Sequence, residues 1–148
     1  MSLINYMDES APLREYALCK LFSGNQIHDA HEIILPDQVS ANCYNSMFDG
    51  CSSLTSAPAL PATSLVDHCY SYMFNGCTSL TTAPALPATN LTKSCYEGMF
   101  YNCTSLTTAP ALPATSLAKY CYSTMFNGCT SLTTAPDLPA TSLADYCY

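Results

Sequence analysis

Basic residues are scarce in this sequence. Its 148 residues include four lysines and arginines against eleven aspartates and glutamates, which gives a formal net charge of −7 at pH 7. Proteins that bind nucleic acid or an anionic membrane present a clustered positive surface, which this chain cannot build. We therefore expect no nucleic-acid partner.

Long apolar runs are also missing. A membrane-spanning helix needs about 20 consecutive, mostly apolar residues, and no run here approaches that length although 49% of the residues are hydrophobic. The first residues, MSLINYMDESAPLREYALCK, lack the basic leader and continuous apolar core of a secretory signal. We expect neither a transmembrane segment nor a signal peptide in this chain.

Signatures of metal binding and catalysis are absent as well. The ten cysteines form no C-x-x-C pair, and there are three histidines. Zinc needs clustered ligands and a nucleophilic cysteine needs a nearby base. His68 precedes Cys69, but adjacent residues of a helix point about 100° apart. We expect no metal, no cofactor and no enzymatic activity.

One small polar cluster stands near the N-terminus. Asp29, His31 and Glu32 are close together in a stretch that matches the rest of the chain poorly. We interpret the cluster as a solvated turn, and weak ion binding is the alternative.

Repetition at a constant step is the dominant feature, and from one copy to the next the residue number rises by 26. Every phenylalanine falls in one column, and two cysteine columns, a methionine column and three leucine columns keep the same step. The phenylalanines are Phe22, Phe48, Phe74, Phe100 and Phe126; the cysteine columns are Cys43, Cys69, Cys95, Cys121 and Cys147, and Cys51, Cys77, Cys103 and Cys129. Such self-similarity indicates a solenoid, in which each unit completes the burial of its neighbour.

The repeat divides the chain into segments. Residues 1–16 precede the repeats, 17–42 form a degenerate capping repeat, and 43–146 hold four complete repeats of equal length. Residues 147–148 start a further repeat that is cut short. We expect one continuous solenoid domain, whose cut end could associate end to end with another copy.

Each unit changes character halfway. Leu65, Cys69 and Met73 recur at i, i+4 and i+8, which predicts a helix of about 8–11 residues. Ser64 and Asp67 fit a capping box at its start, and Gly76 is placed to end it in a left-handed conformation. Gly50 and Gly128 stand at the place of Gly76, and Asn102 replaces glycine there.

The other half of the unit, SLTTAPALPA, is typical of a short strand that passes into a polyproline-like stretch. Proline cannot donate to a β ladder, so Pro58, Pro84, Pro110 and Pro136 should mark the strand ends. The expected fold is an α/β solenoid with one short parallel strand and one short helix per repeat.

The order SLTTAPALP, SLADYCY and MFNGCTSL resembles the BspA-like leucine-rich repeats of bacterial surface proteins. The resemblance covers residues 17–148 and implies a right-handed leucine-rich-repeat superhelix, displayed outside the cell or on its surface, that binds and does not catalyse. The chain departs from the family pattern at Cys69, Cys95 and Cys121, where a branched aliphatic is common, and at Ala83, Ala109 and Ala135.

The cysteines could be core residues, disulfides or metal ligands. Cys69 and Cys77 would lie about 10–12 Å apart along a helix, beyond the 4.4–6.8 Å of a disulfide. Pairing up a column would bring helices closer than their usual 8–10 Å. We favour buried free thiols, with Cys19, which lies outside both columns, as the most exposed thiol.

Two repeated arrays could bind a ligand. The candidate residues are Thr81, Thr82, Thr107, Thr108, Thr133 and Thr134, and Tyr70, Tyr96 and Tyr122. The threonines would form an uncharged hydrogen-bonding ladder at about 4.8 Å spacing, and tyrosine is favoured at interfaces. Both arrays could equally be structural, because threonine suits strands and tyrosine can seal a stack.

Two functions follow from these arrays. The first is surface recognition or adhesion that uses a protein or glycan ligand; the alternative is a structural spacer or stalk without a specific ligand. Ice binding by the threonine ladder is a third idea.

Overall fold

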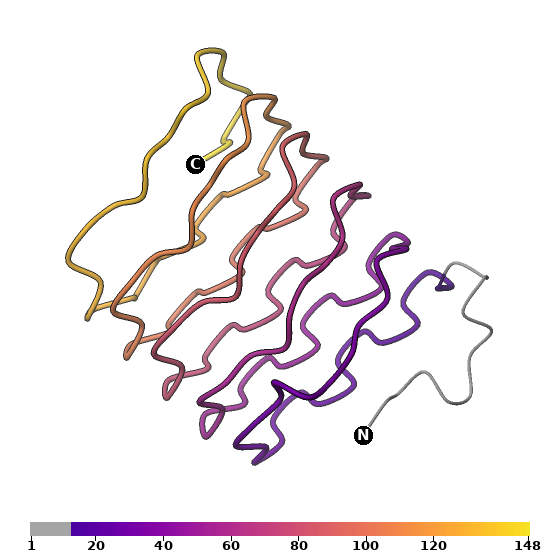
Figure 1. The fold of residues 1–148 in the computed structure, drawn as a ribbon, viewed down its shortest axis with the longest axis vertical. Coiled ribbons are helices and arrows are strands. Elements are labelled where there is room, and N and C mark those ends of the chain that lie inside the picture. The colour runs from indigo at the N-terminus through magenta and orange to yellow at the C-terminus, as the bar shows by residue number, and fades with distance from the viewer. Residues whose placement is uncertain (1–12) are drawn as a thin grey trace.

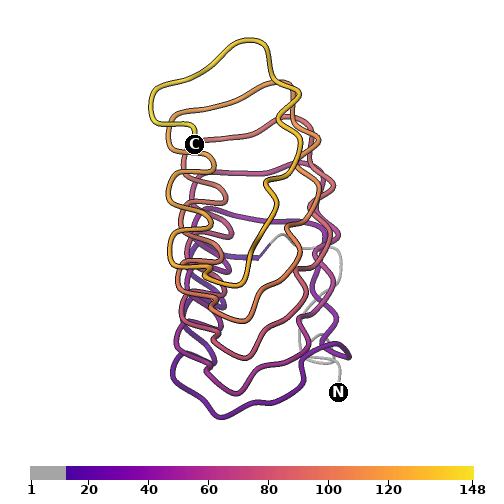
Figure 2. The same cartoon turned by 90° about the vertical axis from the view of Figure 1, so that its left-hand side faces the viewer.

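The computed structural model describes residues 13–148 as a stack of similar coils. Each coil follows a flattened path and lies beside the coils that precede and follow it in the sequence (Figures 1 and 2). The indigo coil at one end and the yellow coil at the other mark the direction of the chain. Within these residues, no helix could span a membrane.

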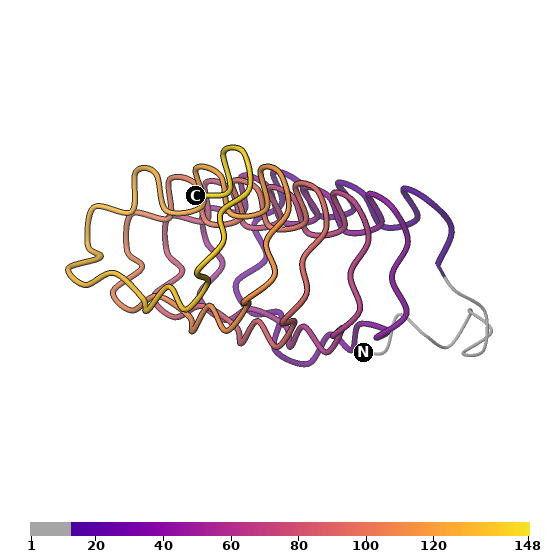
Figure 3. The ribbon, with the colours of Figure 1, turned by 90° about the horizontal axis from the view of Figure 1, so that it is seen from above.

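The predicted helix does not form: no residue of 13–148 is helical. A row of overlapping β-turns replaces it, and Figure 3 shows these turns as a tight zigzag along one side of the stack. We call each such stretch a turn segment. The five turn segments comprise residues 16–24, 42–50, 68–76, 94–102 and 120–128.

Hydrogen bonds alternate along a turn segment. In the segment 68–76, the odd-numbered N–H groups from Cys69 onward donate three residues back, as in Met73 to the Tyr70 carbonyl at 3.2 Å. The even-numbered N–H groups donate to the next coil, as in Tyr70 to the Cys95 carbonyl at 3.0 Å. Each turn segment therefore uses alternate N–H groups for hydrogen bonds within itself and for hydrogen bonds to the next coil.

Every fourth residue of a turn segment has a positive φ, which excludes a helix. In the segment 68–76, φ is 56° at His68, 54° at Tyr72 and 69° at Gly76. A left-handed residue other than glycine costs about 1–2 kcal/mol. Five N–H groups of this segment donate to the next coil, and each such bond contributes about 0.5–1.5 kcal/mol. The bonds between coils therefore offset the strain.

The four-residue turn pattern explains why the sequence predicts a helix. Leu65, Cys69 and Met73 are all buried, so the predicted apolar face is real. Its period is four residues, set by the turns, and not the 3.6 residues of a helix. The left-handed conformation expected at Gly76 is present, as it is at Gly50, Gly128 and Asn102, but as part of the turn pattern and not as a helix end.

The predicted strands are reduced to isolated parallel bridges. These bridges pair Thr82 with Thr108, Asn90 with Ser116, and Asp29 with Ser56. The first two pairs join equivalent positions of adjacent repeats, whereas the third is offset by one position, which fits the degenerate register of the first repeat. Pro84 and Pro110 follow two residues after the first bridge and, lacking an N–H, cannot extend it.

The core consists of columns of identical side chains. Neighbouring phenylalanines stack at 5.3–6.0 Å between ring centroids, with interplanar angles of 3–17°. The tyrosines at 44, 70, 96, 122 and 148 form a second column at 5.4–5.9 Å. Two cysteine columns and the methionine column belong to the same buried core.

Candidate binding surface

The paired hydroxyl residues of successive coils lie next to one another on the surface. We call them the threonine surface: Thr55, Ser56, Thr81, Thr82, Thr107, Thr108, Thr133 and Thr134. All are exposed except Ser56, which is half-buried. Thr82 and Thr108 form a parallel bridge, and the N–H of Thr107 donates to the Thr81 carbonyl at 3.2 Å. The backbone thus fixes the register of the array.

The first threonine of a pair uses its hydroxyl within the stack. Thr107 donates to the Thr81 carbonyl at 3.3 Å, and Thr55 donates to the His28 carbonyl at 2.8 Å. The hydroxyls of Thr82 and Thr108 have no such bond within residues 13–148. These second positions therefore present hydroxyl groups that can bond to a ligand.

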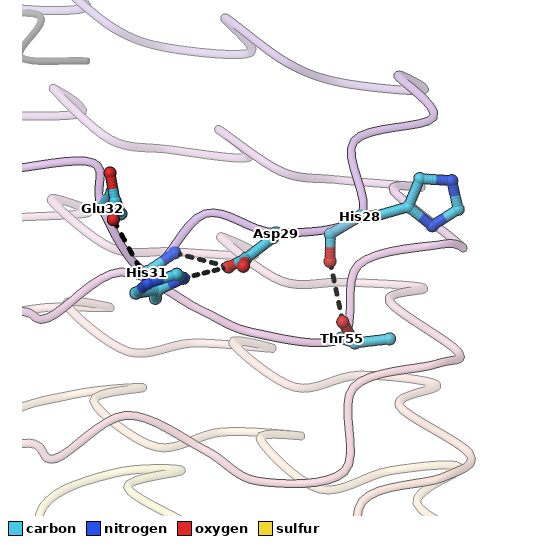
Figure 4. A network of polar contacts seen from close by, with 5 residues as sticks. All are labelled: His28, Asp29, His31, Glu32 and Thr55. Atoms are coloured by element: carbon cyan, nitrogen blue, oxygen red, sulfur yellow. Dashed lines mark hydrogen bonds and ion pairs between the residues drawn. The ribbon is translucent and has the colours of Figure 1, made fainter.

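The threonine surface ends in a histidine and an aspartate at the first coil. His28 and Asp29 take the places of Thr55 and Ser56 there, because the Thr55 hydroxyl donates to the His28 carbonyl (Figure 4) and Asp29 forms a parallel bridge with Ser56. The sequence did not reveal this position because the register of the first repeat is shifted by one residue. The threonine surface is therefore uncharged along the repeats and ends beside the carboxylate of Asp29 at the first coil.

The cluster around His31 is an exposed turn. The Asp29 carboxylate accepts the backbone N–H of His31 at 3.0 Å and lies 2.6 Å from Nδ1 of the His31 ring. These bonds, the backbone one first, lower the pKa of Asp29, and the side-chain bond raises the pKa of His31. Glu32 lies 3.7 Å from His31 Nε2. Among residues 13–148, no three such side chains group to hold a metal ion.

The tyrosines that were one of the two candidate binding arrays are core residues. Tyr70 and Tyr96 are fully buried and Tyr122 is 3% exposed. Tyr96 stacks on both Tyr70 and Tyr122 at 5.8 Å, and the three hydroxyls are buried without a hydrogen-bond partner in the described chain. Close stacking of the coils leaves no room for them outside. They are therefore not part of an accessible surface.

The cysteines are free thiols, and nine of the ten are buried, as predicted. Cys19 is the least buried. Cys51, Cys77, Cys103 and Cys129 each donate Sγ–H to a phenylalanine carbonyl of the preceding coil at 3.0–3.2 Å. The helix-spacing argument against disulfides does not hold, because turns and not helices carry the columns.

Burial suppresses thiol chemistry. It raises the pKa of Cys43 to about 11 and those of Cys95 and Cys103 to about 12. The nucleophile is the thiolate, so these groups stay neutral and unreactive near pH 7. Cys69 is fully buried in the core, and no hydrogen bond within residues 13–148 joins it to the half-buried His68. Within residues 13–148 the arrangement offers hydroxyls that can bind a ligand, and burial disfavours the reactive form of the thiols of Cys43, Cys95 and Cys103.

Comparison with protein families gives one match. A family described as BspA type leucine-rich repeat region matches residues 20–133 with six copies. Among curated proteins no relative matches, and among solved structures none matches.

Proposed function

Because the chain belongs to the BspA-type leucine-rich repeat family, we propose that it is a recognition or adhesion module that binds a protein or glycan through the threonine surface. The family provides repeat-based protein-interaction modules and is generally non-enzymatic. Beyond this family function, we propose that the threonine surface is the part of the molecule that contacts the ligand.

The exposure and register of the threonine pairs carry the proposal. Thr81, Thr82, Thr107 and Thr108 lie on two adjacent coils, all exposed, and a parallel bridge joins the second residues of the two pairs. Solenoids commonly bind through equivalent positions of successive repeats. A ligand that spans several coils would therefore meet the same hydroxyl donor and acceptor at each step.

The chemistry of this surface fits a neutral polar ligand. Threonine hydroxyls both donate and accept hydrogen bonds, and all eight residues of the threonine surface are uncharged threonines or serine. A glycan or an uncharged stretch of protein satisfies these groups without the desolvation cost of a charge.

We place this activity outside the cell or on its surface. BspA-type repeats are typically found in surface proteins, and an array of neutral hydroxyls suits contact with a neighbouring surface. Display on a second cell or matrix component would supply the ligand.

The test is a screen of protein and glycan arrays with the 148-residue chain and two variants. Thr108→Lys introduces a charge in the middle of the threonine surface. Thr115→Lys is the matched control, because Thr115 is an exposed threonine of the same coil outside the surface.

A ligand that binds the original chain and Thr115→Lys, but binds Thr108→Lys at least about tenfold more weakly, would support the proposal. Equal binding to all three chains would place the ligand elsewhere. If the arrays contain no ligand at all, the spacer function is favoured instead.

A further inference from the structure

Three outward residues of the middle turn segments break the repeat pattern. Tyr72 and Tyr101 are each the only aromatic residue in their columns, and Glu97 is the only charged residue in its column. The equivalent residues of the other turn segments are Lys20, Ser46, Gly98 and Thr124 for Tyr72; Cys19, Asn45, Ser71 and Ser123 for Glu97; and Ser23, Asp49, Asn75 and Asn127 for Tyr101. The stacking of the coils does not require these three side chains, because the other coils stack without them.

The three residues come together on two adjacent coils. The Tyr72 N–H donates to the Glu97 carbonyl at 2.8 Å, and the Tyr72 hydroxyl donates to Glu97 Oε1 at 3.4 Å. Tyr101 follows Glu97 by four residues, which is one period of the turn pattern, so both lie on the same side of the segment. Burial first, and then the Glu97 carboxylate, raises the pKa of Tyr72, and Tyr101 adds to this rise. The three side chains therefore lie within electrostatic reach of one another.

A glycine of the next coil leaves room for the Tyr72 ring. Gly98 has a φ of 57°, at a position where the other turn segments carry a side chain. A Cβ on Gly98 would collide with Cδ1, Cε1 and Cζ, which form one edge of the ring. The ring is half-buried and so remains partly accessible. A ring held in this way loses little conformational entropy when a ligand binds.

The carboxylate beside the ring has no cationic partner in the described chain. The ion pairs of residues 13–148 both involve His31, and neither involves Glu97. The whole chain has a net charge of −7, so its field attracts cations. The turn segments 42–50 and 120–128 flank the two coils, which places the three residues in the interior of the stack.

We infer that Tyr72, Glu97 and Tyr101 form a binding site for the guanidinium group of an arginine on a partner polypeptide. A guanidinium group is flat, stacks on aromatic rings and donates two parallel hydrogen bonds to a carboxylate. Tyrosine rings beside an unpaired carboxylate supply both contacts. A neutral ligand could also contact the rings, but it would gain nothing from the charge of Glu97.

This site is independent of the proposed function. It lies on the turn segments, whereas the threonine surface lies outside them. Loss of ligand binding in Thr108→Lys and loss of arginine binding in Glu97→Gln are therefore separate results, and either proposal can fail without the other.

The test is an NMR titration of the isotope-labelled 148-residue chain with the peptide acetyl-Gly-Arg-Gly-amide. The control peptide carries citrulline, which keeps the planar shape of arginine but lacks its charge. Glu97→Gln removes the charge of the site and keeps an acceptor for the Tyr72 hydroxyl. Its matched control is Asp137→Asn, which removes an equal charge from an exposed residue outside the turn segments.

We expect saturable shifts of the Tyr72, Glu97 and Tyr101 amides, and binding of the arginine peptide about 3–30-fold tighter than that of the citrulline peptide. Glu97→Gln should weaken arginine binding at least about threefold, whereas Asp137→Asn should change it less than about twofold. Tyr72→Leu should also weaken it at least about twofold, and Tyr72→Phe, which keeps the ring, should not.

Absence of saturable shifts at the three amides would overturn the inference. Equal affinity for the citrulline peptide would do the same, because it would show a neutral contact. An unchanged affinity of Glu97→Gln, or equal losses in Glu97→Gln and Asp137→Asn, would mean that the peptide responds only to the overall charge of the chain.

Discussion

The thiol of Cys77 donates a hydrogen bond to the carbonyl oxygen of Phe48, 3.2 Å away and 29 residues earlier in the chain. The same oxygen accepts the N–H of Cys51 at 3.0 Å. The cysteine therefore fills the core and also satisfies a backbone acceptor of the preceding coil. All four cysteines of this column make such a bond, whereas in the other column Cys121 alone makes one within residues 13–148, to the Cys147 carbonyl at 3.6 Å.

Serine substitutions should separate the two cysteine columns. The hydroxyl of Cys77→Ser can still donate to the Phe48 carbonyl, whereas the thiol of Cys69 has no acceptor in the described chain. A buried hydroxyl without a partner costs about 1–3 kcal/mol. We expect the free energy of unfolding in urea to fall by about that much more for Cys69→Ser than for Cys77→Ser. Equal losses would contradict the role of the thiol bond.

Thiol labelling should distinguish Cys19 from the rest. Burial excludes a maleimide from nine cysteines, and Cys19 is the least buried. We expect mass spectrometry to show one modified cysteine in the folded chain and ten after denaturation without reductant. Cysteines that become reactive only after reduction would show that disulfides form.

Alkaline pH should destabilise the fold. Burial raises the pKa of Cys43 from 9.0 to about 11 and that of Cys95 to about 12. Between these values and 9.0 the unfolded chain loses protons that the folded chain keeps. The free energy of unfolding therefore falls as pH rises, by about 1.4 kcal/mol per pH unit for each such thiol. Below pH 9 these thiols are protonated in both the folded and the unfolded chain, so they do not make the free energy of unfolding depend on pH.

Urea titrations at a series of pH values measure this dependence. Cys95→Val removes one titrating thiol and should make the decline above pH 9 less steep. A stability that stays constant up to about pH 11 would exclude the linkage.

Removal of a buried hydroxyl should be harmless or favourable in the tyrosine column. The Tyr96 hydroxyl is buried without a partner, whereas that of Tyr44 donates to the Pro36 carbonyl at 3.3 Å. Tyr96→Phe should therefore raise the free energy of unfolding by up to about 1 kcal/mol. The control Tyr44→Phe should lower it by about 0.5–1.5 kcal/mol. Thermal denaturation of both variants tests this, and a loss for Tyr96→Phe would reveal an acceptor.

The sequence predicts the core columns well because packing imposes them directly. Phe48 and Phe74 stack on each other, and this packing favours the same side chain at both positions. Because every column has the same requirement, the columns stay in register and the repeat length is constant. The burial of Cys69 and Cys77 follows from the same argument. The large apolar positions of the repeat could therefore be assigned before the structure was known.

The local backbone could not be predicted in the same way. A helix rotates by about 100° per residue, so residues eight apart differ by about 80° in direction. Leu65, Cys69 and Met73 all face the core and show no such rotation. Three positions are too few, however, to distinguish a four-residue period from the 3.6-residue period of a helix. The clearest sequence signal for a four-residue period is the pair Tyr70 and Phe74. They follow Cys69 and Met73 directly and are also four residues apart.

The candidate surface was only half predictable for a related reason. Thr108 stands beside a strand-like stretch where exposure is expected, and it is exposed. Tyr96 follows a core cysteine, and on a helix it would point to one side of the core. In the turn segment both Cys95 and Tyr96 are buried, because two consecutive residues in every four face inward.

Glycine substitutions should show that the left-handed positions are not equivalent. Gly76 and Gly98 both have positive φ, 69° and 57°. A Cβ on Gly76 would meet only Gly50 atoms at ordinary contact distances of 3.6–3.7 Å, whereas a Cβ on Gly98 would collide with the Tyr72 ring. Gly76→Ala should therefore cost about 1–2 kcal/mol for the strained backbone alone. Gly98→Ala should cost more.

A double-mutant cycle isolates the collision. Tyr72→Ser supplies the small residue that Ser46 provides at the same place of the preceding coil. Combined with Gly98→Ala, it should bring the loss back to that of Gly76→Ala, which gives a coupling free energy of about 0.5–3 kcal/mol. Additive effects in urea unfolding would mean that the Tyr72 ring turns away at no cost, and that the strained backbone alone explains the loss caused by Gly98→Ala.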